Sequence, residues 1–164
     1  MSLEDLSDRS DLIVQARCVR TWAAWDAQKQ IIWTHAELEL QAGLKGAPSQ
    51  RIVVSEPGGM VDGIGVLVEG VPHYQAGEEV VVFLYRTPGG LLRTRGLGQG
   101  KFTVFADRTT GALAVRNNAG RLGLVSPQGA EPRGIQREEL DGMGLEKFLG
   151  IVRGLVAARS EGVR

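Results

Sequence analysis

Regular alternation of apolar and polar residues in the segment 31–40, IIWTHAELEL, constrains the fold of this chain more than any other feature. Ile32 and Leu38 fall in one phase of the alternation, and His35 falls in the other. Because successive side chains of a strand point to opposite faces, a period of two predicts a half-buried β-strand. The preceding segment 11–25 is also rich in β-forming residues, so the two segments together predict one long β-hairpin.

Further strands and one helix are expected along the rest of the chain. The apolar run VVVFLYRT at 80–87 does not alternate, which predicts a strand covered on both faces. Apolar residues recur at helical spacing over 145–159. We therefore expect a mainly β fold, a five- to six-stranded Greek-key barrel followed by a C-terminal α-helix. One domain is expected to span residues 1–164, with the barrel at about 11–118 and a loop at about 119–134.

Glycine is abundant, with 23 residues in 164, and three of them lie in GLGQGKF at 96–102. A Walker phosphate loop requires G-x-x-x-x-G-K-[S/T] followed by a helix. Here Phe102 follows Lys101, Arg95 occupies the place of the first glycine, and β-forming residues come next. We therefore expect the three glycines to lie on one face of a strand and to let it bend around a small barrel.

Known catalytic, cofactor and metal motifs do not appear in the sequence. The single cysteine, Cys18, excludes an intrachain disulfide, and His35 and His73 lack metal-binding spacing. We expect no cofactor, no metal and no catalytic residues. A small enzyme with a site assembled from loops, around Asp62, His73 and Glu78, is the last of three functional alternatives.

Two tryptophans and a histidine suggest an interaction surface. If the first hairpin turns near 27–29, Trp25 and Trp33 fall on the same face, together with His35. Two large rings on a polar face would form a contact surface. A covering helix or loop is an equally weighted alternative.

A modest group of basic residues near the glycines suggests a weak anion or ligand groove at Arg93, Arg95 and Lys101. A nucleic-acid or oligosaccharide binder that uses the barrel face is therefore the second functional alternative. The formal net charge is zero, with 19 basic and 19 acidic residues, and only nine residues are aromatic (three Trp, two Tyr and four Phe). Both properties argue against nucleic acid as the partner.

Five segments occur in an order that resembles a group of uncharacterised, mostly exported bacterial proteins: SDLIVQARCVR at 10–20, WTHAELELQAGLKG at 33–46, RIVVSEPGG at 51–59, AGEEVVVFLYR at 76–86 and GLGQGKFTV at 96–104. More remotely, the order is similar to the netrin-like module, the barrel of the tissue inhibitors of metalloproteinases, whose pattern matches residues 11–19, 45–46 and 77–83. The resemblance covers the chain up to about Asn118 and implies a barrel of the oligonucleotide/oligosaccharide-binding (OB) type with a helix packed against it. It does not imply inhibition, because those inhibitors chelate the protease metal through an N-terminal cysteine that this chain lacks.

The leading functional expectation is a non-catalytic, extracytoplasmic binding or protein-interaction module. Its partner would be a protein or cell-surface component, or a second copy of the chain, and nucleic acid is disfavoured. No run of residues is long and apolar enough to span a bilayer. We expect an export signal to precede this sequence in the full protein, which would place it in the periplasm or outside the cell, with the cytoplasm as the alternative.

Overall fold

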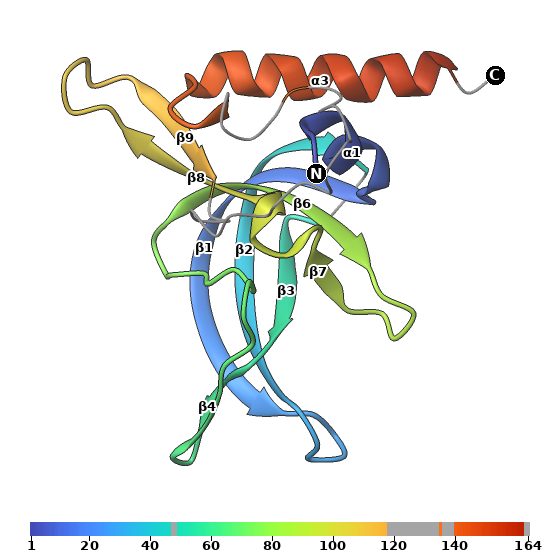
Figure 1. Cartoon of the computed structure of the whole chain (residues 1–164), viewed down its shortest axis with the longest axis vertical. Coiled ribbons are helices and arrows are strands. Elements are labelled where there is room, and N and C mark those ends of the chain that lie inside the picture. Colours follow the sequence, from blue (N-terminus) through green and yellow to red (C-terminus); the bar gives the residue numbers. More distant parts are fainter. Residues whose placement is uncertain (47–48, 118–134, 136–139, 163–164) are drawn as a thin grey trace, which may run out of the picture.

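The computed structural model of this chain describes residues 1–46, 49–117, 135 and 140–162, and its elements are mainly strands (Figure 1). In chain order these are helix α1 (Leu3–Arg9), strands β1 (Leu12–Trp25), β2 (Ile32–Lys45), β3 (Arg51–Pro57), β4 (Gly59–Val61), β5 (Ile64–Val66), β6 (Glu79–Arg86) and β7 (Leu92–Thr94), the 3-10 turn η1 (Leu97–Gly100), strands β8 (Lys101–Ala106) and β9 (Leu113–Asn117), and helix α3 (Leu145–Gly162). The expected loop at 119–134 lies outside the described residues. No helix within the described part is both long and apolar enough to cross a membrane.

Five strands form a largely closed ring. They follow the order β1-β2-β3-β7-β6, and β1 pairs with β6 to close it. The seam between β3 and β7 is parallel and has a single register pair, Val54 with Leu92, whereas the other pairings in the ring are antiparallel. The β8–β9 hairpin continues the sheet beyond β6, and β4 and β5 form a separate two-stranded sheet. The predicted barrel-like β fold with a C-terminal helix is thus confirmed.

Bulges in β1 accompany its curvature. The β1–β2 register shifts after Ile13, after Gln15 and again after Cys18. Each shift bends and twists the strand, and residues 13–17 of β1 pair with β2 along one edge and with β6 along the other, which closes the ring. The prediction that Gly96, Gly98 and Gly100 lie on one strand face is wrong, because they belong to the turn that joins β7 to β8.

Within this turn, Gly100 allows the chain to pass close to neighbouring backbone. A Cβ atom at Gly100 would lie 2.3 Å from the carbonyl oxygen of Arg95 and 3.1 Å from that of Phe83. Lys101 then begins strand β8, so no helix follows the glycines. The glycine stretch therefore shapes the backbone, as expected, but it forms a tight turn and not a strand bend.

Two hydrophobic cores lie on opposite faces of β6, whose residues Val80 to Leu84 are fully buried. Inside the barrel, Val80, Val82 and Leu84 pack in one cluster with Cys18. On the outer face, Val81 and Phe83 join side chains from α1 and α3. The predicted two-sided burial of this strand is confirmed, as is the burial of the Cys18 thiol inside the barrel.

Helix α1 was not expected from the sequence. Ser2 and Asp5 form a reciprocal capping box at its start. Leu3 and Leu6 are buried in the outer core, where they contribute apolar contacts alongside α3. The two helices lie together over one end of the barrel (Figure 1).

We predict that Gly100→Ala destabilises the chain, because its methyl group would crowd the carbonyl oxygens of Arg95 and Phe83. These are backbone atoms, which cannot move aside as the end of a flexible side chain can. The free energy of unfolding in urea should fall by about 2 kcal/mol or more. Gly154→Ala in α3 is the matched control, since nothing lies within 4 Å of a Cβ there. That change should stabilise the helix by about 1 kcal/mol. Equal stability of the two variants would contradict the turn geometry.

Candidate functional site

The aromatic residues of the first hairpin do not lie as predicted. Trp25 pairs with Ile32, which is fully buried, whereas Trp33 pairs with Ala24. Trp25 and Trp33 therefore point to opposite faces, and the prediction that they share one is wrong. The predicted turn at 27–29 is centred on residue 28, whereas the pairing of Trp25 with Ile32 centres the hairpin between residues 28 and 29. The register therefore differs by one residue from the predicted one, and such a slip turns the side chains of one strand to the other face.

A different aromatic pair occupies the outer face of the hairpin. The ring centroids of Trp22 and His35 are 5.3 Å apart, and the guanidinium of Arg20 lies 4.6 Å from the Trp22 ring centroid. His35 Nδ1 and Ser55 Oγ, on the neighbouring strand β3, are hydrogen-bonded at 2.7 Å. Glu37 accepts from Arg20 at 3.3 Å. We call these five residues the outer strip, and burial lowers the pKa of His35 within it.

A groove of about 510 Å³ borders the outer strip, where β3 faces the β6–β7 connection. Its lining includes His35, Ile52, Val53, Ser55, Arg86 and Leu92. The volume is in the range of small-ligand pockets. The groove therefore combines apolar side chains with a few polar groups at the edge of the barrel.

The predicted basic groove is not formed. Arg93 donates to Glu56 at 3.2 Å, and the guanidinium of Arg95 stacks 4.1 Å from the Tyr85 ring centroid. Lys101 is only 1% exposed, so its ammonium group does not line a groove at the surface with Arg93 and Arg95.

Lys101 points into the barrel because of its place in the β6–β8 register. It pairs with Val82, whose side chain belongs to the inner core. Its ammonium group lies 2.8 Å from a carboxylate oxygen of Glu78 and donates to the carbonyl oxygen of His73 at 2.5 Å. It also lies 4.8 Å from the centroid of the Tyr74 ring. The buried charge is thus paired and hydrogen-bonded.

A second buried carboxylate lies nearby in the barrel. Glu56, 3% exposed, accepts from the backbone N–H of Thr94 at 2.7 Å as well as from Arg93. The Thr94 and Tyr74 hydroxyls are hydrogen-bonded at 2.7 Å. Burial raises the pKa of Glu56, and the bonds from Thr94 and Arg93 oppose that shift. We call Glu56, Tyr74, Glu78, Thr94 and Lys101 the inner polar cluster.

The loop residues proposed for an enzyme site are only partly brought together. Glu78 and the carbonyl of His73 both contact Lys101. Asp62 instead lies in the turn between β4 and β5. Within the described part of the chain, no group of three or more His, Cys, Asp or Glu side chains could hold a metal ion.

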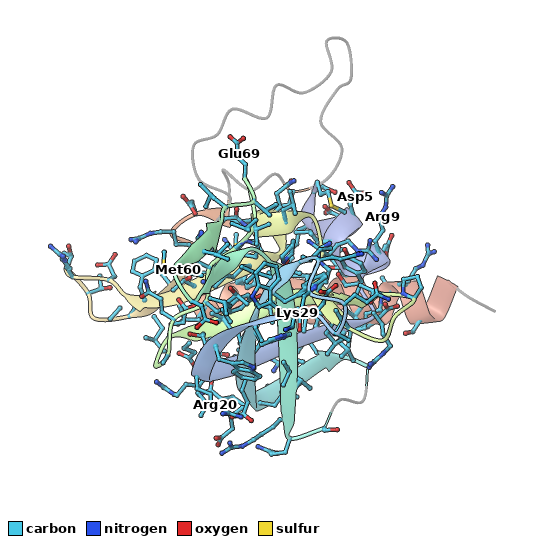
Figure 2. All side chains as sticks on the ribbon, turned by 90° about the horizontal axis from the view of Figure 1, so that it is seen from below. Asp5, Arg9, Arg20, Lys29, Met60 and Glu69 are labelled. Atoms are coloured by element: carbon cyan, nitrogen blue, oxygen red, sulfur yellow. The ribbon has the colours of Figure 1, made fainter. Side chains whose placement is uncertain are left out.

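The β4–β5 hairpin and the residue after it, 59–67, form a finger near the tip of the β1–β2 hairpin (Figure 1). Its turn residues, Asp62 and Gly63, have φ values of 50° and 79°, as a two-residue hairpin turn requires. The exposed apolar residues of the finger are Met60 (70%), Ile64 (52%), Val66 (42%) and Leu67 (85%). Figure 2 looks at the molecule from this end, with Met60 on the finger and Lys29 in the β1–β2 turn.

The sequence analysis missed the finger as a candidate surface, although an Asp-Gly pair between apolar residues is a hairpin signal. Comparison with known proteins adds no family to this description. No protein-family model matches the chain, and no curated protein is significantly similar to it.

We predict that Lys101→Met leaves the Glu78 carboxylate poorly compensated and lowers the free energy of unfolding by about 3 kcal/mol. Adding Glu78→Gln to the same chain removes the carboxylate charge that has lost its Lys101 partner, and it keeps a side-chain oxygen that can accept from the backbone N–H of Gln75. The double variant should therefore recover most of the lost free energy of unfolding. Urea unfolding of the wild type, the two single variants and the double variant measures this. Additive effects of the two substitutions would contradict a direct pair.

Proposed function

We propose that this chain is a non-catalytic protein-interaction module on an OB-type barrel, and that the β4–β5 finger makes the principal contact. The observation that carries the proposal is the exposure of four neighbouring apolar side chains on the finger, with Leu67 85% and Met60 70% exposed. Single exposed apolar residues are ordinary, whereas a contiguous group of them often marks an interaction site. The resemblance to exported proteins extends the proposal to an extracytoplasmic setting.

The strand order supports the OB-type part of the proposal. Strand β6 returns beside β1, so β6-β1-β2-β3 follows the order of a Greek key. The long connection of such a motif here runs from β3 to β6, and it contains the finger. A five-stranded Greek-key ring is the architecture of OB folds, which support many binding functions.

The inner polar cluster supports a structural role for the buried charges. Glu78 pairs with Lys101, and Glu56 accepts from Thr94 and Arg93. Their side chains are committed to contacts within the barrel, and this favours the finger over the cluster as the functional feature.

A second candidate function is oligosaccharide or nucleic-acid binding in the groove beside the outer strip. The groove is lined by residues of β2 and β3, including His35 and Ser55, and OB folds bind ligands on the face of their second and third strands. Arg86 supplies a positive charge, but Glu37 and Glu39 lie on the same side of β2 as His35. We therefore place this function second.

Site-specific photocrosslinking tests the protein-interaction proposal. A benzophenone amino acid would replace Leu67 or Met60 in cells that make the protein, and Arg108, exposed in the β8–β9 turn, would serve as control. We expect a discrete protein adduct from positions 67 and 60 and none from position 108. Equal labelling at all three positions, or none at the finger, would refute the proposal. Binding to glycan or oligonucleotide arrays that Arg86→Glu abolishes would favour the second function.

A further inference from the structure

The finger has the form of an incomplete sheet. It consists of two strands of three residues each, and all three residues of β5 are exposed. A two-stranded hairpin is marginally stable in water, and a third strand commonly completes such a unit. Among the residues that the structure describes, β5 pairs only with β4, so the finger presents one free side to them.

The outer edge of β5 offers backbone groups for pairing. The turn at Asp62–Gly63 makes Val61 and Ile64 the pair that exchanges hydrogen bonds next to the loop. By alternation, the N–H and C=O of Gly65 then point away from β4. Strand β5 is Ile-Gly-Val, so it contains none of the lysines or prolines that commonly block a free edge.

Charge within the segment that contains the finger is one-sided. Residues 52–85 contain no Lys or Arg but contain Glu56, Asp62, Glu69, Glu78 and Glu79. Of these, Asp62 in the finger turn and Glu69 beyond its end are exposed. The finger is therefore apolar and acidic, and it is complementary to a partner that is apolar and basic.

We propose that β5 pairs with an extended segment of a partner protein, which adds a third strand to the finger. Every second side chain of this segment is apolar, and the segment also carries Lys or Arg. This inference rests on the proposed function and names the kind of partner. The segment's backbone pairs with Gly65, its apolar side chains contact Ile64 and Val66 on one face, and its basic residues approach Asp62 and Glu69.

Other occupants are less well matched to the finger. An anionic bilayer would be repelled by Asp62 and Glu69, and the stretch 52–85 lacks the Lys and Arg that attract such a surface. A second copy could pair edge to edge, but two acidic fingers would then be brought together. Both remain outcomes of the experiment below.

The experiment selects binders from a displayed library of random peptides, about twelve residues long to match strand-like recognition, on the immobilised chain. The selected peptides should alternate apolar residues and be enriched in Lys and Arg. Gly65→Ala, which keeps the N–H, should bind them like wild type. Gly65→Pro removes that outward N–H and should weaken binding about tenfold or more. Asp62→Asn keeps a turn-forming residue and should weaken binding severalfold at low salt.

The outcomes separate the two proposals. Peptides that need the exposed apolar residues of the finger, tested as the serine variant of Met60, Ile64, Val66 and Leu67 together, but bind Gly65→Pro like Gly65→Ala would refute strand addition and leave the proposed function intact. If no selected peptide depends on these four residues, the proposed function fails as well. Finger-dependent peptides without basic enrichment would refute the charge match.

Three further measurements complete the test. Finger-dependent binding to vesicles of phosphatidylcholine and phosphatidylserine would show that a bilayer, and not a peptide segment, contacts the finger. A dimer in light scattering that Gly65→Pro abolishes would show that a second copy of the chain does so. Either result would overturn the inference. If Gly65→Pro disturbs the finger itself, amide exchange decides in the wild-type chain. Bound peptide should protect the Gly65 N–H, and an unchanged exchange rate would refute pairing at this edge.

Discussion

The packing of β6 between two hydrophobic cores is the interaction on which the rest of the structure depends. Its residues Val80–Leu84 are buried on both faces. One edge of the strand pairs with β1, and the other is shared by β7 and β8. Ring closure, attachment of the β8–β9 hairpin and docking of α1 and α3 therefore all involve the same strand. Loss of apolar volume there would weaken both cores together.

The barrel holds the finger at its base, and no described strand other than β4 pairs with β5. Gly58 N–H donates to Ile32 O at 2.8 Å, and the Thr34 hydroxyl donates to Gly58 O at 2.8 Å. A Cβ at Gly59 would lie 2.5 Å from Thr34 Oγ1, so close packing fixes the start of β4. This arrangement presents the apolar side chains of the finger from a rigid support, which limits the entropy lost when a partner binds.

Long periodic signals predicted the main elements, whereas the details of the candidate surfaces depended on pairing. The alternation around His35 and the unbroken apolar run of β6 each identify a strand. Whether Trp25 and Trp33 share a face depends on whether the hairpin is centred on residue 28 or between residues 28 and 29, and composition does not define this centre. Lys101 faces inward only because of its register with distant Val82. The strands of the finger, three residues each, are too short for a period to be recognised.

A well-packed barrel carries a finger whose outer edge pairs with no strand in the described part of the chain. Native-state amide hydrogen exchange measures both parts in one experiment on the free chain. Amides of 80–84 should exchange only through global unfolding, while the Gly65 amide should exchange at least about a hundredfold faster. Protection of Gly65 as strong as that of β6 in the free chain would mean that its edge is already covered, which would contradict strand addition at β5.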